Sequence, residues 1–381
     1  MKNKNVEKYF HGTIYYFRTI GFDYENKNKL MHYYLMAGII NSAIIIFGQI
    51  SFNIFQEVNL QQRTTNLSYL NYYLVSSAKL IALFFYRDTV NDVLNEFRQI
   101  YPSEDLEKAY KLDKYLRQSL MIEKILAIFF EVVTIFYTWF PLVLSVLDFI
   151  DSGKFSFRLP YMCWYGFNFA KYNYWFYGFK YLLQAHATWV SAITILALDL
   201  CLFSSLLQLC MHFDIINKNI LSIEAAKDEE ATALLKEQVA YHQKLLSLAE
   251  KLNAVFTPSV LFSLLSSSLI ICFTGFQLLG DITLFIVVKA IFLLAYELKQ
   301  VAITCFLGDK LIEISLKISD AIYEHNWYKG TPKYRRLVLM VLMRSQHSVA
   351  LHIAGISDIS LQTFRQVMSI SYQIFTLLRT G

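Results

Sequence analysis

The chain alternates between long apolar stretches and shorter polar segments. A helix needs about 20 mostly apolar residues to cross the roughly 30 Å hydrocarbon core of a bilayer. Few Gly or Pro residues interrupt the apolar stretches, which is typical of helices rather than of strands joined by turns. The pattern predicts an all-α membrane protein with seven transmembrane helices, at residues 31–53, 68–86, 121–147, 182–212, 254–279, 281–307 and 357–378.

The polar segments between these helices differ in basic residues, and this difference predicts an orientation. If the N-terminus is cytoplasmic, the inside segments, taken as residues 1–30, 87–124, 213–253 and 299–344, carry 26 Lys and Arg residues, and the outside segments carry 6. Basic residues accumulate in cytoplasmic loops. We therefore expect a cytoplasmic N-terminus and an extracellular C-terminus. The one glycosylation sequon, Asn66-Leu67-Ser68, falls on the outer side in this arrangement.

Composition narrows the class of protein further. Of 381 residues, 55% are hydrophobic and only 17% are charged, whereas an ordinary soluble domain has about a quarter of its residues charged. The net charge of +5 does not indicate nucleic-acid binding. The five cysteines show no Cys-x-x-Cys spacing, and no hydrolase, nucleotide-binding or zinc-protease motif occurs. We therefore expect neither an enzyme, nor a metal site, nor a cofactor.

The predicted cytoplasmic segments contain helices of their own. Apolar residues recur at intervals of three and four in two stripes, which indicates helix-to-helix seams. Thr331-Pro332 is typical of a helix start, with a capping residue followed by Pro in the first turn. Such helices form either a base for contact with other subunits or a fold against their own chain. The stripes are Leu235, Val239, His242, Leu246 and Ala249, and Ile314, Ile318 and Ile322.

The predicted outer loop at residues 149–181 is unusually aromatic. It includes Tyr161, Trp164, Tyr165, Tyr174 and Trp175. Aromatic residues gather at the membrane surface, where their rings lie among the lipid headgroups. The loop is therefore either an interfacial belt or a lid over a cavity.

The last 74 residues, from Gly308, resemble the C-terminal region of insect odorant receptors. The order and spacing of several short motifs carry this resemblance. The rest of the chain matches that family only in span number, orientation and loop lengths. The motifs are Ala321-Ile322-Tyr323 with Trp327, Arg344-Ser345-Gln346, Leu361 with Phe364, and Ser371-Tyr372 followed by Phe375-Thr376-Leu377-Leu378.

The resemblance implies a ligand-gated, non-selective cation channel opened by a small volatile organic ligand. It implies a heterotetramer around one pore, in which odorant coreceptor subunits supply the remaining positions. It also implies that the last span lines the pore and that cytoplasmic helices anchor the assembly. The resulting division is residues 1–30 as a cytoplasmic segment, 31–307 as spans one to six with cytoplasmic extensions near 213–253, 308–356 as anchor helices, and 357–381 as the pore helix with a short tail.

Three related or rival classes need to be separated. The first is a gustatory-type homotetrameric ligand-gated channel, but gustatory receptors typically end in a Thr-Tyr motif that Ser371-Tyr372 does not match. The shared coreceptor has a large insertion between spans four and five, where this chain has only about 40 residues. A secondary transporter is the third alternative, and it would show internal repeats. We see no such repeat.

The topology places candidate residues for both sites. An odorant pocket is expected to be apolar and aromatic with a few polar groups. In the outer half of the helices the candidates are Tyr69, Tyr72, Tyr73, Ser76, Phe136, Tyr137, Trp139, Phe140, Thr188, Trp189, Phe273 and Phe276. In the last span, residues that recur every three or four positions are candidates for the pore wall, namely Phe364, Met368, Ser371, Phe375 and Leu378.

Overall fold

The computed structural model describes residues 4–22, 29–166, 174–279, 284–353 and 357–380, and these residues are almost entirely helical. In chain order the helices are α1 (Lys4–Thr19), α2 (Lys29–Phe55), α3 (Leu60–Phe85), α4 (Arg87–Ile100), α5 (Glu104–Ala109), α6 (Asp113–Ser152), α7 (Tyr174–Leu221), α8 (Asp228–Gln277), α9 (Leu284–Glu324), α10 (Pro332–Ser345) and α11 (Leu361–Thr380). A 3-10 turn, η2 (Trp327–Lys329), and a two-stranded hairpin, β1 (His352–Ile353) and β2 (Ser357–Asp358), complete them.

The seven predicted spans fall on α2, α3, α6, α7, α8, α9 and α11. Among the described residues, five helices are long and apolar enough to cross a membrane, namely α2, α6, α7, α8 and α9. Helices α3 and α11 carry more polar residues, such as Gln61, Gln62 and Arg63 in α3 and Gln362, Arg365 and Gln366 in α11.

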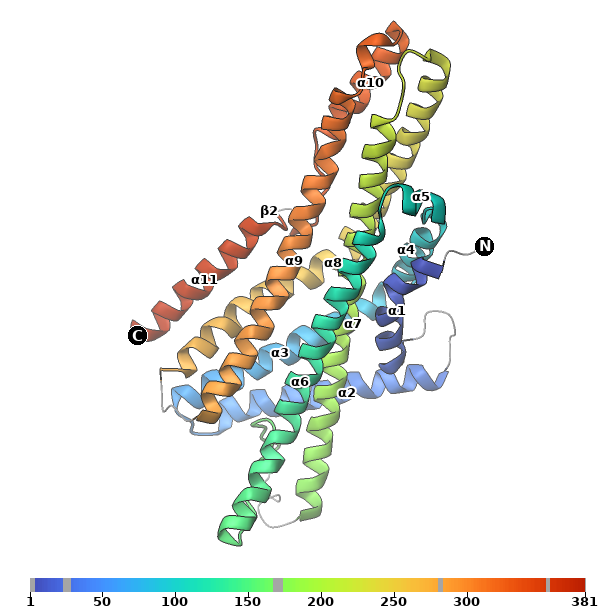
Figure 1. The fold of residues 1–381 in the computed structure, drawn as a ribbon. Coiled ribbons are helices and arrows are strands. Elements are labelled where there is room, and N and C mark those ends of the chain that lie inside the picture. The colour runs from blue at the N-terminus through green and yellow to red at the C-terminus, as the bar shows by residue number, and fades with distance from the viewer. Residues whose placement is uncertain (1–3, 23–28, 167–173, 280–283, 354–356, 381) are drawn as a thin grey trace.

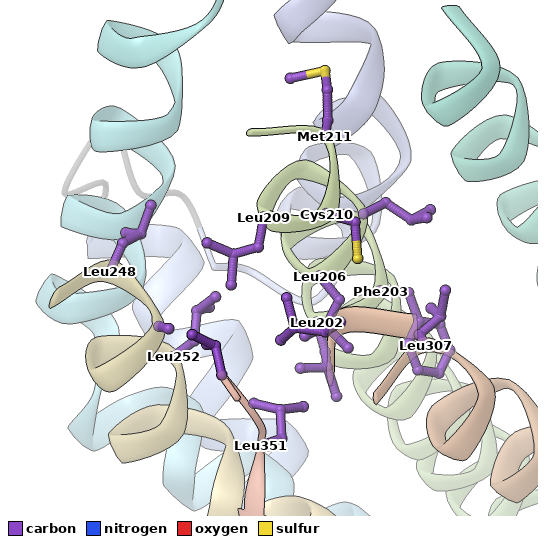
Figure 2. Packing of buried hydrophobic residues seen from close by; sticks show 14 of the residues in the cluster. Leu202, Phe203, Leu206, Leu209, Cys210, Met211, Leu248, Leu252, Leu307 and Leu351 are labelled. Atoms are coloured by element: carbon purple, nitrogen blue, oxygen red, sulfur yellow. The ribbon is translucent and has the colours of Figure 1, made fainter. Parts of the chain in front are cut away.

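Helix α7 is the centre of the fold. It packs against α1, α2, α3, α6, α8 and α9, and its most apolar part is buried throughout. Figure 2 shows Leu202, Phe203 and Leu206 of α7 among side chains of α8, α9 and the segment before β1, with Leu252, Leu307 and Leu351 labelled. A helix that is apolar all round must be surrounded by other elements, and that requirement places α7 on the axis of the bundle.

Residues 1–30 hold a helix where we expected a plain segment. Tyr9, Phe10 and Phe17 of α1 are at most 1% exposed and belong to the same core as α7. Helix α4 packs on α8, and its residues Val90, Val93, Leu94 and Phe97 are buried. These short helices escape a search for membrane spans because only one of their faces is apolar.

The ends of α7, α8 and α9 project beyond the other helices together with α10, toward the top of Figure 1. We call this part the projecting bundle. Leu235, His242, Ile318 and Ile322 are buried there, so the two predicted stripes pack helices of the same chain against one another. Thr331 caps α10 as predicted, since its side chain accepts a hydrogen bond from the backbone N–H of Tyr334.

The hairpin joins the projecting bundle to α11. Strand β1 pairs antiparallel with β2, and the Asn253 side chain of α8 bonds both the carbonyl of Ala350 and the N–H of His352. Helix α11 then runs along the side of the molecule against α8 and α9 (Figure 1).

The structure corrects the interpretation of the sequon. Asn66 lies within α3, is fully buried, and donates a hydrogen bond to the main-chain carbonyl of Gln49 at 3.0 Å. A side chain in this position is closed to glycosylation in the folded chain. The sequon therefore gives no support to the predicted orientation.

Candidate functional site: a tyrosine-lined cavity

A cavity of about 50 Å³ lies among α3, α6, α7 and α9. This is room for a few water molecules. Aromatic rings and aliphatic side chains form most of the wall, and hydroxyl groups face it from several sides. The lining residues are Ser68, Tyr69, Tyr72, Phe130, Val133, Thr134, Tyr137, Tyr161, Thr188, Ala192, Leu293 and Tyr296.

Helical spacing brings these residues to one place. Phe130, Val133, Thr134 and Tyr137 follow one another at intervals of three, one and three along α6, so they share one face of that helix. Helix α3 begins after Asn59, whose side chain accepts a hydrogen bond from the N–H of Gln62. This cap fixes the first turn of the helix that carries the tyrosines of the opposite wall.

The tyrosine rings meet edge to face. The Tyr161 ring lies 5.1 Å from that of Tyr69 and 5.4 Å from that of Tyr73, with interplanar angles of 78° and 81°. The Tyr69 and Tyr137 rings are 6.1 Å apart at 84°. Edge-to-face contacts stabilise a pair of rings beyond the burial of their area. The wall is therefore an ordered aromatic cluster.

Tyr161 closes the cavity from the predicted outer loop. Its N–H donates to the Gln184 side-chain oxygen at 3.1 Å, and the Gln184 amide returns a bond to its carbonyl at 3.2 Å. The Thr188 hydroxyl lies 3.2 Å from the Tyr161 hydroxyl and 3.0 Å from that of Tyr73. This part of the loop is thus a lid held on α7.

Other residues of the same loop lie at the surface. Trp175 is 89% exposed, and Tyr174 is also exposed. An exposed aromatic side chain next to an apolar span fits an interfacial belt. The interfacial belt stays a prediction for these exposed residues, and residues 167–173 lie outside the described part.

A second, polar cavity of about 20 Å³ adjoins the first, and Tyr72 and Tyr296 line both. Lys79 of α3 forms an ion pair with Asp199 of α7 at 2.6 Å, with both side chains almost fully buried. The Ser267 hydroxyl of α8 donates to the Glu297 carboxyl group at 2.6 Å. Polar groups are costly in the membrane interior unless they are paired. The ion pair joins α3 to α7, and the hydrogen bond joins α8 to α9.

The structure brings part of the predicted pocket together. Tyr69, Tyr72, Tyr137 and Thr188 line the cavity. Tyr73, Ser76 and Phe136 lie behind its wall: Tyr73 bonds Thr188, Ser76 donates to the carbonyl of Ser191, and Phe136 packs on the same aromatic cluster. The cavity lining does not include Trp139, Phe140, Trp189, Phe273 or Phe276, and of these Trp139 is 57% and Trp189 45% exposed.

Some lining residues are not among the predicted pocket residues, namely Tyr296 and Leu293 of α9, and Phe130 and Thr134 of α6. The intervals along α6 would have found the latter two, since Phe130 lies about two turns and Thr134 about one turn before Tyr137. No pattern marks Tyr296, because only the packing of α9 against α6 and α7 turns it to this cavity.

The predicted stripe on α11 faces its own subunit. Ser371 is buried, and Phe364, Met368, Phe375 and Leu378 are half-buried against α8 and α9. The Phe375 ring lies within van der Waals reach of Gly275 on α8. The exposed residues of α11 include a polar row, Gln362, Arg365, Gln366, Ser369 and Gln373, and also the apolar residues Leu361, Ile370 and Leu377 and the ring of Tyr372.

The chain is similar in sequence to known proteins. The family model described as "7tm Odorant receptor" matches residues 59–372. Odorant receptor 67c of Drosophila melanogaster is 28% identical, with 96% of this chain and 94% of that protein covered. Odorant receptor 85c of the same insect is also 28% identical, with 92% and 91% covered.

The fold is that of a solved protein. The insect olfactory receptor OR5 from Machilis hrabei, determined in complex with eugenol, superposes with a TM-score of 0.85. The superposition covers 99% of both chains, and 16% of the residues are identical. The structure of that receptor alone superposes with a TM-score of 0.78.

Proposed function

Because the chain belongs to the seven-transmembrane odorant receptor family, we propose that it is a ligand-tuned subunit of a cation channel that a small volatile molecule opens. Membership confirms a multi-pass, all-α membrane protein that is a receptor and not an enzyme. It favours this interpretation over the gustatory receptor and transporter alternatives. The coreceptor partnership and the cation selectivity are part of the proposal.

The tyrosine-lined cavity is the observation that carries the proposal. It is apolar, with hydroxyl groups at defined positions, as expected for a site that binds a small, poorly soluble molecule. The Machilis hrabei receptor of the same fold was determined with eugenol, a small aromatic molecule. The cavity has room for only a few water molecules in this arrangement, so a volatile ligand would fit only when α3, α6, α7 and α9 move apart, and its binding would favour that wider arrangement.

The pore is proposed to lie along α11. The structure supports a particular face, because the stripe with Ser371 packs on α8 and α9 while the face with Ser369 is exposed and polar. A hydrated pore favours polar side chains. We therefore assign the Ser369 face to the pore or to a neighbouring subunit, and the Ser371 stripe to contacts within the chain.

This assignment is testable with a matched pair of serines. In Ser369→Cys, a charged, membrane-impermeant thiol reagent should reduce the ligand-evoked current within minutes, whereas Ser371→Cys and the wild type should not respond. If the reagent reduces the current of Ser371→Cys and not that of Ser369→Cys, the pore lies along the predicted stripe with Ser371.

The function itself is tested by whole-cell current during application of a panel of volatiles. Cells should express this chain alone, an insect odorant coreceptor alone, or both. Current that requires both chains supports a tuning subunit of a heteromeric channel. Current from this chain alone would contradict the required coreceptor, and no difference between the pair and the coreceptor alone would contradict the proposed function.

A further inference from the structure

Three lysine side chains from three helices meet around one aspartate. The Lys114 ammonium nitrogen of α6 lies 3.0 Å, and that of Lys218 from α7 3.3 Å, from the same carboxyl oxygen of Asp214. The Lys114 nitrogen is also 4.8 Å from the ring centre of Tyr115, and the nitrogen of Lys310 from α9 is 4.9 Å from the same ring centre. We call Lys114, Lys218 and Lys310 the lysine cluster.

The lysine cluster carries more charge than its carboxylate compensates. Among the described residues that pair with these lysines, Asp214 supplies the carboxylate. Two neighbouring carboxylates pair with other cations, since Asp113 lies 2.7 Å from the Arg117 guanidinium and Glu313 lies 2.6 Å from the Lys317 ammonium. Three ammonium groups around one carboxylate leave a surplus of two positive charges.

The lysine cluster is also able to receive an anion. Like charges repel one another, and the fold nevertheless holds these ammonium groups together. Burial lowers the pKa of the Lys310 side chain, and the charge of Lys114 acts in the same direction. The side chains of Lys114 and Lys218 are 55% and 32% exposed, so an anion can reach them. A bound anion would relieve the repulsion and accept several N–H bonds at once.

The position of the lysine cluster favours a lipid as the source of that anion. Lys218 and Lys310 follow the predicted spans on α7 and α9, and Lys114 precedes the predicted span on α6. Each lies within about two helical turns of the end of its span. This is close to the level of the lipid headgroups, which a long lysine side chain can reach. Basic residues gathered beside a membrane span attract anionic lipids.

We propose that the lysine cluster binds the phosphate monoester of an anionic lipid headgroup, such as that of a phosphorylated phosphatidylinositol. A phosphate monoester carries about −1.5 to −2 charges at pH 7 and offers three strong acceptor oxygens. Both properties match three ammonium groups with two surplus charges. The proposal goes beyond the channel function and does not depend on it, because its test measures binding to the chain itself.

The first experiment compares short-chain lipids on the purified full-length chain in a non-ionic detergent. The probes are dioctanoyl phosphatidylinositol 4-phosphate, dioctanoyl phosphatidylinositol, dioctanoyl phosphatidylserine, and inositol 1,4-bisphosphate, which is the phosphorylated headgroup without acyl chains. Ligand-induced thermal stabilisation gives the apparent Kd, because a ligand that binds only the folded state raises its melting temperature. At least tenfold tighter binding of phosphatidylinositol 4-phosphate than of the other three probes supports the proposal.

Each other outcome contradicts a stated part of the proposal. Equally tight binding of phosphatidylinositol or phosphatidylserine would overturn the requirement for a phosphate monoester. Equally tight binding of inositol 1,4-bisphosphate would show that a soluble phosphate compound, and not a lipid, occupies the site. Stabilisation by none of the probes would overturn the site.

The second experiment removes the carboxylate that competes with the phosphate. In Asp214→Asn the amide oxygen can still accept the hydrogen bond that the Tyr115 hydroxyl donates to Asp214 at 3.1 Å. This variant should bind phosphatidylinositol 4-phosphate at least threefold more tightly than the wild type. Unchanged or weaker binding would show that the lysines serve only to hold Asp214, and would overturn the proposal.

The third experiment removes the lysines. The triple variant Lys114→Gln, Lys218→Gln, Lys310→Gln should bind phosphatidylinositol 4-phosphate at least tenfold more weakly than the wild type. Lys227→Gln is the control, because Lys227 pairs with Glu224 at 3.1 Å in the turn between α7 and α8, and its Kd should not change. An unchanged Kd in the triple variant, or equal weakening in Lys227→Gln, would overturn the site. If the triple variant does not fold, the gain expected of Asp214→Asn still decides.

Discussion

At the scale of single residues, the hydroxyl of Thr188 holds the lid of the cavity. It donates to the carbonyl of Gln184 at 2.8 Å and lies within hydrogen-bond reach of the Tyr73 and Tyr161 hydroxyls. A valine has nearly the same shape but would leave both tyrosine hydroxyls without this partner. Loss of a buried partner costs about 1–3 kcal/mol.

Thr188→Val should therefore weaken ligand potency by about tenfold or more, since 1.4 kcal/mol corresponds to a factor of ten. Dose–response curves of ligand-evoked current measure this, with surface labelling as a check on expression. Thr194→Val is the control, because the Thr194 hydroxyl bonds the Val190 carbonyl and does not line the cavity. Equal potency of Thr188→Val and the wild type would remove the lid from ligand binding.

The buried ion pair gives a second prediction at this scale. Asp199→Asn would leave the Lys79 ammonium without its carboxylate partner, and breaking a buried pair from one side costs about 3–5 kcal/mol. Surface expression should fall severalfold and should recover partly in the double variant Lys79→Met, Asp199→Leu. Glu313→Gln, which breaks the exposed pair with Lys317, should leave expression unchanged. Normal expression of Asp199→Asn would show that the pair contributes little.

At the scale of elements, the contact between α9 and the start of α11 depends on one glycine. A Cβ atom at Gly308 would overlap the carbonyl oxygen of Ile359, which lies two residues before α11. Backbone cannot move aside as a flexible side chain can. The position of the proposed pore helix relative to α9 therefore requires a residue without a side chain here.

Gly308→Ala should lower the free energy of unfolding by about 1–3 kcal/mol, as expected for overpacking. The melting temperature of the purified chain should fall accordingly. Gly178→Ala is the matched control, because nothing lies within 4 Å of a Cβ there and Ala favours a helix more than Gly does. A melting temperature in Gly308→Ala equal to that of the wild type would show that α11 moves away freely.

At the scale of the whole molecule, the projecting bundle has a pH-sensitive core. His242 of α8 packs against Phe213 of α7, with ring centres 5.9 Å apart. Burial first, and then the charge of Arg344, lowers the pKa of His242 to about 4. Burial likewise lowers the pKa of His325, beside Tyr334. Both histidines are therefore neutral in the folded bundle at pH 7.

A lowered folded-state pKa means that the unfolded chain binds more protons between about pH 6.5 and 4. The stability from burying neutral His242 is fully present above pH 6.5 and is lost as the pH falls through this range. At pH 5.5 the loss should be on the order of 1 kcal/mol. Melting temperatures at pH 7.5 and 5.5 measure it, and His242→Gln should reduce the difference. If the melting temperatures at pH 7.5 and 5.5 differ as much in His242→Gln as in the wild type, other groups cause the pH dependence.

The sequence by itself determined the class of the protein and its long apolar helices. Apolar stretches of membrane-spanning length predicted α2, α6, α7, α8 and α9, and the C-terminal motifs indicated the family that the comparisons confirm. A local signal such as Thr331-Pro332 predicts the start of α10 correctly, because a helix cap depends on residues only three positions apart. Orientation in the membrane stays a prediction.

Only the tertiary structure decided which side chains share a site. Tyr137 and Trp139 lie on the same helix two residues apart, yet Tyr137 lines the cavity and Trp139 faces outward, because successive helical positions turn by about 100°. The pairing of Lys79 with Asp199 and the approach of Lys289 to Tyr69 depend on how helices far apart in sequence pack. A single sequence gives the period of each helix, but its rotation against its neighbours is fixed only by the packing of the whole bundle.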